Sequence, residues 1–347
     1  MKTINFAIIG FGNIAKNHAL AVCDANLRFS LPYKMNISHV VTRKPVDVSI
    51  NGVKNVLDIE EVLKDESVDF IDICTPNDSH YDIVKKAIEF GKPIYCEKPL
   101  ASNYEDALEM TDLVEKNNIK NSVALMYRFI PAVRLLKREL KKDTIGDIID
   151  FKIRTYHKSY LSEKKKGSWR TLKASGGGAL LDLGVHLIDL IHFTLDEIEE
   201  VDCNTKIHFK DRSKVDEIAN CNLMLKNGMS GSLEVSRIFS ERHQTDDYTI
   251  FGTKGSIKVD FTKPYEVEIY EYESNSTEIK SVSAGDEILK YYSSKRSSLG
   301  FFQNSHTASL INFVNTIYDE NSLDIAAKFK DALKSQRIVE LAYEKVK

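Results

Sequence analysis

The sequence predicts an α/β fold, in which a doubly wound parallel sheet is followed by an α+β domain with an open, mainly antiparallel sheet. Strand and helix patterns alternate as far as residue 123, which is typical of a parallel sheet with right-handed crossovers. Beyond that point strand-like runs dominate and tight turns join several of them, which favours antiparallel pairing. The length of 347 residues suits two domains, which we place at 1–123 and 124–347.

The first domain contains five predicted strands with helices between them. The strands are expected at 3–9, 37–42, 68–74, 93–96 and 121–125, and the helices at 13–25, 58–63, 79–90 and 103–117. The second strand begins late along the chain. We therefore interpret the stretch 26–36 as an inserted loop.

The second domain contains seven predicted strands and four helices. The strands are expected at 147–157, 199–209, 215–226, 229–239, 247–252, 255–261 and 265–273, and the helices at 131–141, 180–194, 303–319 and 325–345. An open sheet leaves one face without helices, and association of chains is a natural way to cover it. We expect a homodimer or a homotetramer formed through this face.

The composition argues against several kinds of partner. The formal net charge is −3, so no nucleic acid is expected. None of the five cysteines forms a CxxC pair, which predicts neither a disulfide framework nor a metal site, and reduced thiols fit a cytoplasmic location. We find no apolar stretch of membrane-spanning length and expect no membrane partner.

A glycine turn follows the first predicted strand and opens the first predicted helix. Its sequence is Gly10-Phe11-Gly12-Asn13-Ile14-Ala15, and this strand–turn–helix context is what a dinucleotide-binding turn requires. Gly10 would allow the tight turn, and Gly12 would let the backbone approach the pyrophosphate. The amides of Asn13 and Ile14 would then point at the phosphates. A glycine turn without a ligand is the alternative.

The end of the second predicted strand bears on the choice of cofactor. An acidic residue there would bind the adenosine ribose and select NAD(H). The strand instead ends in Thr42-Arg43-Lys44, where Arg43 could stack on adenine and pair with a 2′-phosphate. This favours NADP(H), with NAD(H) as the alternative. Arg43 and Lys44 could also be ordinary solvated charges.

Three side chains have the chemistry needed to oxidise a secondary alcohol, which requires a base and a hydride acceptor. Lys98 follows a buried strand at the carboxyl edge of the predicted sheet, where ligands bind in such folds. Asp182 and His186 are four residues apart on a predicted helix and share one face, so the carboxylate can orient the imidazole. A surface or capping pair is the alternative. The preceding Gly176-Gly177-Gly178 indicates a ligand contact or a sharp bend.

At Glu97-Lys98-Pro99 the chain begins to resemble the glucose-fructose oxidoreductase / inositol dehydrogenase (Gfo/Idh/MocA) family. The likeness covers essentially the whole chain and continues through Cys74 to His80, Tyr127 to Ala132, Ser175 to His186 and Ala332 to Tyr343. It implies a Rossmann domain followed by a substrate-binding domain. It also implies that His186 accepts the proton, that Asp182 binds the substrate and supports His186, and that Lys98 bridges the substrate and the nicotinamide.

Further residues are assigned by their place in these motifs. Along the cofactor we expect Thr75, Pro76, Asn77, His80 and Glu97, with Arg128 at the nicotinamide end and Trp169 and Arg170 closing over it. Tyr156 and Lys173 are expected to contact the substrate. His80 could equally be a polar residue at a helix start, Trp169 could simply pack, and His306 could face the substrate or cap a helix.

Together these features predict an NAD(P)-dependent oxidoreductase acting on a secondary alcohol or carbonyl of a sugar, sugar derivative or cyclitol. Two alternatives come from other branches of the same superfamily: a non-catalytic dinucleotide-binding regulator and an NAD-assisted glycoside hydrolase. Because Lys98, Asp182 and His186 are all present, we favour catalysis.

Overall fold

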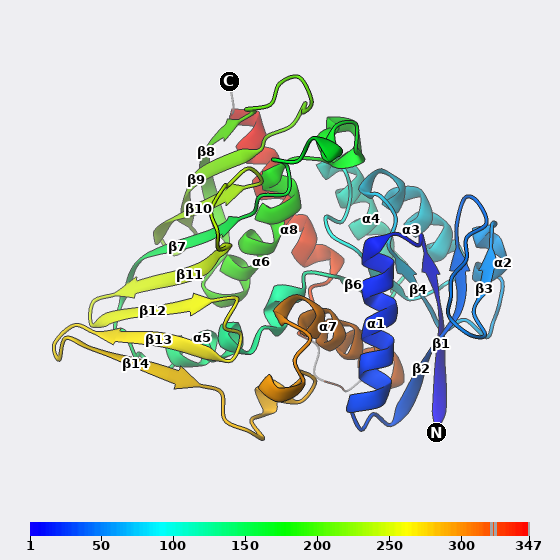
Figure 1. Cartoon of the computed structure of the whole chain (residues 1–347), viewed down its shortest axis with the longest axis horizontal. Coiled ribbons are helices and arrows are strands. Elements are labelled where there is room, and N and C mark those ends of the chain that lie inside the picture. Colours follow the sequence, from blue (N-terminus) through cyan, green and yellow to red (C-terminus); the bar gives the residue numbers. More distant parts are fainter. Residues whose placement is uncertain (320–321, 323–324, 346–347) are drawn as a thin grey trace. The chain divides into compact units, whose positions relative to one another are not determined.

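The computed structural model divides the chain into two compact units (Figure 1). It describes every residue except 320–321, 323–324 and 346–347. Unit 1 comprises Met1–Met126 and Phe302–Leu333, and unit 2 comprises Tyr127–Phe301 and Lys334–Lys347. The predicted boundary at residue 123 lies close to the first of these divisions. The assignment of all of 124–347 to the second domain is wrong, because the chain returns to unit 1 at Phe302.

Unit 1 is built on a six-stranded parallel sheet with the order β3-β2-β1-β4-β5-β6. The strands are β1 (Lys2–Ile9), β2 (Tyr33–Val41), β3 (Lys54–Val56), β4 (Phe70–Ile73), β5 (Ile94–Cys96) and β6 (Asn121–Val123). The helices between them are α1 (Asn13–Arg28), α2 (Ile59–Leu63), α3 (His80–Glu89) and α4 (Tyr104–Lys116). The predicted doubly wound sheet is therefore confirmed.

The stretch 26–36 is not an inserted loop, contrary to the prediction. Helix α1 continues to Arg28 and strand β2 already begins at Tyr33. The side chain of Asn26 ties the two elements together, since its amide donates to the carbonyl of Met35 at 2.8 Å and its oxygen accepts from the Met35 N–H at 3.0 Å. Polar residues at helix and strand ends obscured both boundaries in the sequence.

Helix α7 (Phe301–Tyr318) belongs to unit 1 from Phe302 onward and packs on the parallel sheet. The rings of Phe313 and of Phe70 on β4 pack at 82° with centroids 5.3 Å apart, and Ser309 accepts a hydrogen bond from Tyr95 on β5 at 2.8 Å. These contacts join residues more than 200 positions apart. Periodicity reveals a helix but not its distant partner, so the sequence placed α7 in the wrong domain.

Unit 2 is built on an eight-stranded sheet with the order β14-β13-β12-β11-β7-β10-β9-β8. Its strands are β7 (Ile148–Tyr156), β8 (Ile198–Lys206), β9 (Ile218–Leu225), β10 (Ser230–Ser236), β11 (Thr245–Gly252), β12 (Gly255–Asp260), β13 (Glu266–Glu271) and β14 (Ser276–Ser281). Among the described strand pairs of this sheet, only β7 and β10 run parallel. The prediction of a mainly antiparallel sheet is therefore confirmed. Strand β14, a largely exposed edge strand, was not predicted from the sequence.

The helices of unit 2 line one face of its sheet (Figure 1). Helices α5 (Pro131–Leu140) and α6 (Val185–Thr194) pack there, and most of α8 (Phe329–Lys345) belongs to this unit. The opposite face carries charges that pair between strands. Its ion pairs are Lys152 with Glu234, Arg154 with Asp247 and Lys258 with Asp247. We call this surface the charged sheet face.

One described segment is long and apolar enough to cross a membrane by composition, which corrects the expectation that none exists. An 18-residue window of this segment, Lys173–Thr194, has a mean hydropathy of 1.3, but 94% of that window is buried inside the protein. Its apolar character is explained by its central position in unit 2. The segment, which ends in α6, is therefore part of the core of this unit.

Candidate active site

The glycine turn has the geometry that a dinucleotide-binding turn requires. Gly10 has a positive φ of 88°, and its N–H donates to the carbonyl of Val41 at 2.8 Å. A Cβ atom at Gly10 would lie only 3.0 Å from the carbonyl oxygen of Cys74. At Gly12, the N-cap of α1, a Cβ atom would meet nothing within 4 Å. Gly10 thus serves the turn itself, whereas Gly12 leaves open space in front of the helix N-terminus, where phosphate oxygens can approach.

The end of strand β2 lies beside this turn, as the Gly10–Val41 hydrogen bond shows. The hydroxyl of Thr42 donates to the carbonyl of Lys44 at 2.7 Å and accepts from the Asn55 amide at 2.9 Å. Thr42 therefore shapes the loop with its own side chain. Arg43 and Lys44 are exposed and supply positive charge at this edge of the sheet.

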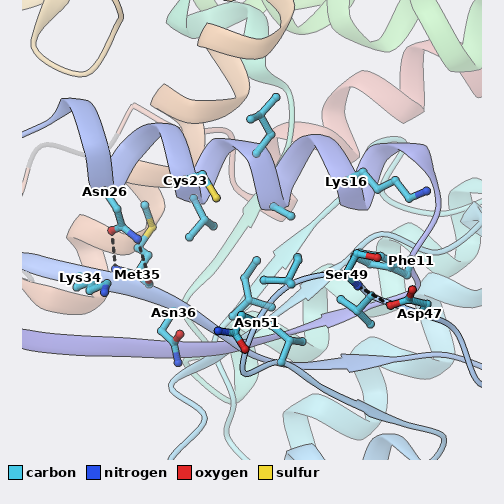
Figure 2. A pocket seen from close by; sticks show the side chains of 17 residues that line it. Phe11, Lys16, Cys23, Asn26, Lys34, Met35, Asn36, Asp47, Ser49 and Asn51 are labelled. Atoms are coloured by element: carbon cyan, nitrogen blue, oxygen red, sulfur yellow. Dashed lines mark hydrogen bonds between the residues drawn. The ribbon is translucent and has the colours of Figure 1, made fainter.

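A cavity of about 490 Å³ lies along the neighbouring part of α1 (Figure 2). Its lining comes from α1, β2 and the loop 47–53, with Lys16 and Lys34 towards opposite ends in the view. Phe11 of the glycine turn contributes to the wall. Neither Gly12 nor Lys98 is among the residues that line this cavity.

The loop after β4 carries three residues expected along the cofactor, Thr75, Pro76 and Asn77. The methyl group of Thr75 would lie 3.0 Å from a Cβ at Gly10, so this loop borders the glycine turn. Asn77 is buried. His80 opens α3, and its ring nitrogens lie 3.1 Å from the carbonyls of Thr75 and Leu100. Burial lowers the pKa of His80. The ring thus braces two loops, which agrees with the alternative of a helix-start residue.

Glu97 and Lys98 follow β5 at the same edge of the sheet. The Glu97 N–H donates to Ile73 at 2.9 Å, which extends the pairing with β4 by one residue. The Glu97 carboxylate accepts the N–H of Lys98 at 3.1 Å. The Lys98–Pro99 bond is cis. The Lys98 side chain is half-buried and follows a strand end fixed on both sides.

Behind Lys98 lies a set of buried ionisable side chains that was not predicted from the sequence. His18 of α1 places Nδ1 2.9 Å from Asp72 and Nε2 3.0 Å from Glu97. Donor atoms of His18, Glu97 and His306 lie within 4.8 Å of one another, but both nitrogens of His18 already contact carboxylates. The arrangement is therefore that of an ion pair. Asp72, a carboxylate inside an otherwise apolar strand, was the available signal.

In unit 2, Asp182 and His186 lie on one continuous helical segment. Asp182 is in a π-helical turn, Leu180–Gly184, that leads directly into α6. Such turns are rare and often mark functional sites. The carboxylate pairs with Arg237 and lies 4.0 Å from Arg170. The ring of Tyr127 stacks on His186, with centroids 4.6 Å apart and planes at 13°. Arg237 and Tyr127 were not assigned to the site from the sequence.

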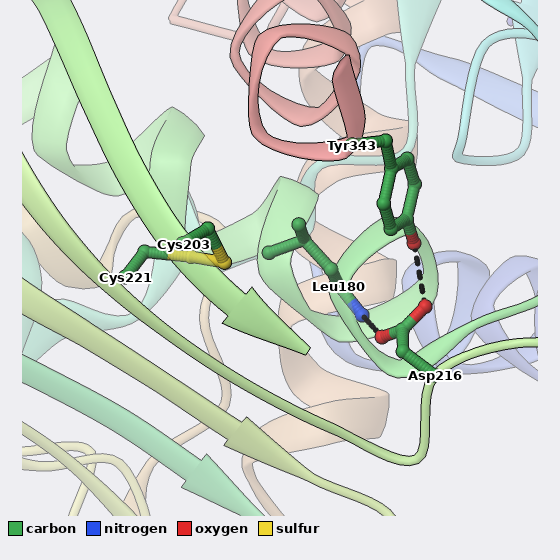
Figure 3. Close-up of a disulfide and its surroundings, with 5 residues drawn as sticks. All are labelled: Leu180, Cys203, Asp216, Cys221 and Tyr343. Atoms are coloured by element: carbon green, nitrogen blue, oxygen red, sulfur yellow. Dashed lines mark hydrogen bonds between the residues drawn. A yellow bond between two sulfur atoms is a disulfide. The ribbon is translucent and has the colours of Figure 1, made fainter. Parts of the chain in front are cut away.

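The three glycines before this helix are required by packing and by backbone conformation. Gly176 and Gly178 have φ values of 66° and 122°, and a Cβ at Gly177 would meet the carbonyl of Arg170. A Cβ at Gly178 would meet Asp216, which accepts from the Leu180 N–H at 2.8 Å and from Tyr343 at 2.7 Å (Figure 3). The sequence left two explanations for the three glycines, a ligand contact or a sharp bend, and the structure favours the bend.

Four more predicted residues lie in unit 2 with different surroundings. Arg128 is buried, and its guanidinium is held by two hydrogen bonds to Asp189 of 2.6 and 2.8 Å, so it braces unit 2. The guanidinium of Arg170 lies 4.2 Å from the ring centroid of Trp169, close to Asp182. Lys173 is exposed. Thus Arg170 is brought to Asp182, whereas the Arg128 guanidinium is committed to a structural ion pair.

Strand β7 presents Tyr156 to the side opposite the helices. Its hydroxyl donates to Glu234 on the charged sheet face. The preceding Thr155 is buried beneath the helices and pairs with Asp246 of β11. His157 lies 3.6 Å from Asp246. Side chains alternate between the two faces of a strand. Thr155 and His157 therefore lie towards the helix-covered face, whereas Tyr156 between them lies on the charged sheet face.

A disulfide joins Cys203 and Cys221 at directly opposed positions of β8 and β9 (Figure 3). Their Cα atoms are 4.0 Å apart. The expectation of five reduced thiols is therefore wrong at this pair. Spacing along the sequence could not reveal it, because the two residues become neighbours only through strand pairing. Cys23, Cys74 and Cys96 are free thiols.

Comparison with known proteins agrees with this architecture. Residues 4–125 match the model of an oxidoreductase family with an NAD-binding Rossmann fold, and residues 133–258 match the GFO/IDH/MocA C-terminal domain. The chain belongs to the GFO/IDH/MocA family of oxidoreductases. The predicted family, and with it the prediction of a nicotinamide-dependent oxidoreductase, is confirmed.

Three relatives illustrate what members of this family do. Levoglucosan dehydrogenase of Pseudarthrobacter phenanthrenivorans is 28% identical over 78% of this chain and 76% of its own length. An NAD⁺-dependent scyllo-inositol 2-dehydrogenase of Bacillus subtilis is 28% identical over 80% of this chain and 79% of its own. A levoglucosan dehydrogenase structure in complex with NADH superposes with a TM-score of 0.87 at 25% identity, covering 99% of this chain and 98% of that chain.

Proposed function

We propose that this protein exchanges a hydride between NADP(H) and a secondary alcohol or carbonyl group of a sugar, sugar derivative or cyclitol. The observation that carries the proposal is the shared sheet edge in unit 1. Strands β1 and β5 belong to one parallel sheet, so the glycine turn after β1 and Lys98 after β5 lie at the same carboxyl edge. Ligands bind at this edge in doubly wound folds. Relatives named as sugar and cyclitol dehydrogenases support the substrate class.

Each proposed catalytic side chain has a role that its surroundings support. When bound, the nicotinamide supplies the hydride acceptor or donor. Lys98 holds the substrate oxygen with its ammonium group and limits the charge that develops there. His186 accepts the hydroxyl proton during oxidation and returns it during reduction. Asp182 binds a neighbouring hydroxyl. Its carboxylate pairs with Arg237 and lies 4.0 Å from Arg170, and these contacts hold it in place.

The catalytic roles are tested with a panel of sugars and cyclitols, by following nicotinamide absorbance. Once a substrate is found, Lys98→Ala and His186→Asn should each lower kcat by about 10²–10⁴-fold. Lys86→Ala, at an exposed lysine of α3, is the matched control and should keep full turnover. Absence of any net reduction of free cofactor across the panel would favour a regulator or an NAD-assisted hydrolase instead.

The preference for NADP(H) rests on Arg43. This residue is exposed beside the glycine turn, where Gly10 contacts the end of β2. A guanidinium hydrogen-bonded to the 2′-phosphate contributes roughly what a charge-assisted hydrogen bond does, so Arg43→Ala should weaken NADP⁺ binding by about 10–100-fold. Binding of NAD⁺, which lacks that phosphate, should change little. Equal losses for both dinucleotides in titration calorimetry would refute the preference.

We also propose that copies of the chain associate through the charged sheet face. The described helices of unit 2 line the other side of this sheet (Figure 1), and Phe251 and Met224 are exposed on the charged sheet face. Light scattering should give a dimer or a tetramer. Thr249→Arg, at a half-buried position of β11 on this face, should shift the distribution towards monomers. An unchanged mass would place the interface elsewhere.

A further inference from the structure

Three buried side chains from three different segments of unit 1 form what we call the buried triad: Asp72, His18 and Glu97. Only 1% of the surface of His18 is exposed, and Asp72 is fully buried. The Nδ1 atom of His18 lies 3.0 and 2.9 Å from the two oxygens of Asp72, and Nε2 lies 3.0 Å from one oxygen of Glu97. His18 therefore bridges two carboxylates out of contact with water.

The contacts define the charge of each member. A neutral imidazole carries one N–H and can donate to only one of the two carboxylates, whereas an imidazolium donates to both. Burial alone would lower the pKa of His18, but the charge of Asp72 raises it well above its ordinary value. Burial alone would raise the pKa of Glu97, but the bond to His18 lowers it to about 2. His18 is thus held charged between the carboxyl groups of Asp72 and Glu97.

The remaining groups around His18 leave this charge distribution in place. The thiol of Cys74 lies 3.3 Å from Nδ1, and burial raises its pKa, so it stays protonated. The ring of Tyr95 lies 5.6 Å away, and burial raises the pKa of its hydroxyl. The ring of His306 lies 5.1 Å away, and burial lowers its pKa to about 3, so it stays neutral.

The triad joins the three parts of the proposed dinucleotide edge. His18 lies on α1, six residues after the Gly12 cap of the glycine turn. Asp72 lies on β4, whose end leads into the Thr75 loop. Glu97 lies directly before Lys98 and accepts its backbone N–H at 3.1 Å. A change at His18 is therefore transmitted to the backbone of Lys98 through a single carboxylate.

We propose that His18 is a positioning residue for the reaction: by holding the Glu97 carboxylate, it fixes the backbone of Lys98 relative to the helix that begins at the dinucleotide turn. Stability alone does not require such an arrangement, because well-packed apolar side chains are often as stable as a buried ion pair. Placement does require it, since an error of about 1 Å in a catalytic group can cost on the order of 100-fold in rate. The inference rests on the proposed function of Lys98.

The test begins with a readout that needs no substrate. In His18→Gln, amide hydrogen exchange should accelerate at least about tenfold at Lys98, whose N–H depends on Glu97, while the amides of β1 keep their protection. His39→Gln is the matched control, because it removes another buried histidine of unit 1 whose Nδ1 contacts Ser38. Unchanged exchange at Lys98 in His18→Gln would overturn the proposal.

Turnover provides the second readout. His18→Gln should lower kcat by about 10–100-fold and change the dissociation constant of NADPH by less than about threefold. It should also add an acidic limb to the pH profile of kcat, since Glu97 without an imidazolium can take up a proton. The double variant His18→Gln/Glu97→Gln should lack that limb and lose no more activity than the more impaired single variant. Additive losses, or an unaltered profile, would leave His18 with a structural role only.

The two proposals fail in different ways. Full activity in Lys98→Ala would refute the role of Lys98, whereas impaired Lys98→Ala beside fully active His18→Gln would refute only the positioning role. Should His18→Gln not fold, Asp72→Asn removes one partner of the imidazole and leaves Glu97 in place. It should then show the same faster exchange at Lys98 to a smaller extent. Unchanged exchange at Lys98 in a folded Asp72→Asn variant would likewise overturn the proposal.

Discussion

The stability of unit 1 should fall in mild acid because of His306. This residue lies on α7 with 2% of its surface exposed, between the ring of His18 at 5.1 Å and the ring of Phe302 at 4.6 Å. Burial, followed by repulsion from charged His18, lowers its pKa to about 3. The folded protein therefore keeps His306 neutral at pH values where an unfolded chain would protonate it.

The magnitude follows from proton linkage. The unfolded value is 6.5 and the folded value about 3, so the unfolded state binds the extra proton as the pH falls below 6.5, and the stabilisation of the fold is lost from there towards pH 3. Within this window, each unit by which the pH falls lowers the free energy of unfolding by about 1.4 kcal/mol. Between pH 8 and pH 5 the free energy of unfolding should therefore drop by about 2 kcal/mol through His306 alone.

Urea unfolding of the wild type and of His306→Gln at pH 8 and pH 5 checks this figure. The pH-dependent loss should be smaller in His306→Gln by about 2 kcal/mol, whatever the variant costs at pH 8. His80, whose pKa is also lowered by burial, is present in both proteins, so its effect cancels in the comparison. His243→Gln removes an exposed histidine as a control. If wild type and His306→Gln lose the same free energy, the linkage argument is refuted.

Two other results follow from local geometry. Gly12→Ala should change the free energy of unfolding by less than about 1 kcal/mol yet weaken NADPH binding more than tenfold, because its Cβ meets no protein atom and fills the space open to phosphate. Gly10→Ala should instead destabilise the fold by at least about 1–2 kcal/mol, since the φ of Gly10 is 88°. Calorimetric melts with and without dinucleotide distinguish the two variants. Equal destabilisation by both substitutions would contradict these predictions. Thiol titration in denaturant should count three groups, Cys23, Cys74 and Cys96, before reduction, and a count of five would exclude the Cys203–Cys221 bond.

Local sequence signals predicted the parts of the fold that depend on local chemistry. The glycine turn, the alternating elements of unit 1 and the hairpins of unit 2 each follow from the periodicity and turn residues of one short segment. Strands β3 and β14 escaped because the first has three residues and the second is largely exposed. Helix α7 was recognised as a helix, but the domain it joins is decided by Phe70 and Tyr95, far away along the chain.

The candidate site shows the same division between residue type and partner. The side chains of Arg128 and Tyr156 are of types that bind ligands, which is why the sequence suggested a functional role. The sequence does not show that Arg128 is hydrogen-bonded to Asp189 and Tyr156 to Glu234. Every second side chain of β7 faces the helices. Because the strand has mixed polarity, its periodicity does not define which of the two alternating sets this is. Asp72 is the instructive case, because a carboxylate within a buried strand requires a partner, and that partner is His18.

The two units support their proposed catalytic groups in a similar physical way. In unit 1, Lys98 follows a carboxylate that His18 holds in place; in unit 2, Asp182 is paired with Arg237 and lies near Arg170. Both pairings hold a carboxylate in one place. The ring of Tyr127 stacks on His186 with centroids 4.6 Å apart, and this contact orients the imidazole. A general base must be held within hydrogen-bonding reach of the proton that it accepts, so these contacts support the proposed roles of Lys98, Asp182 and His186.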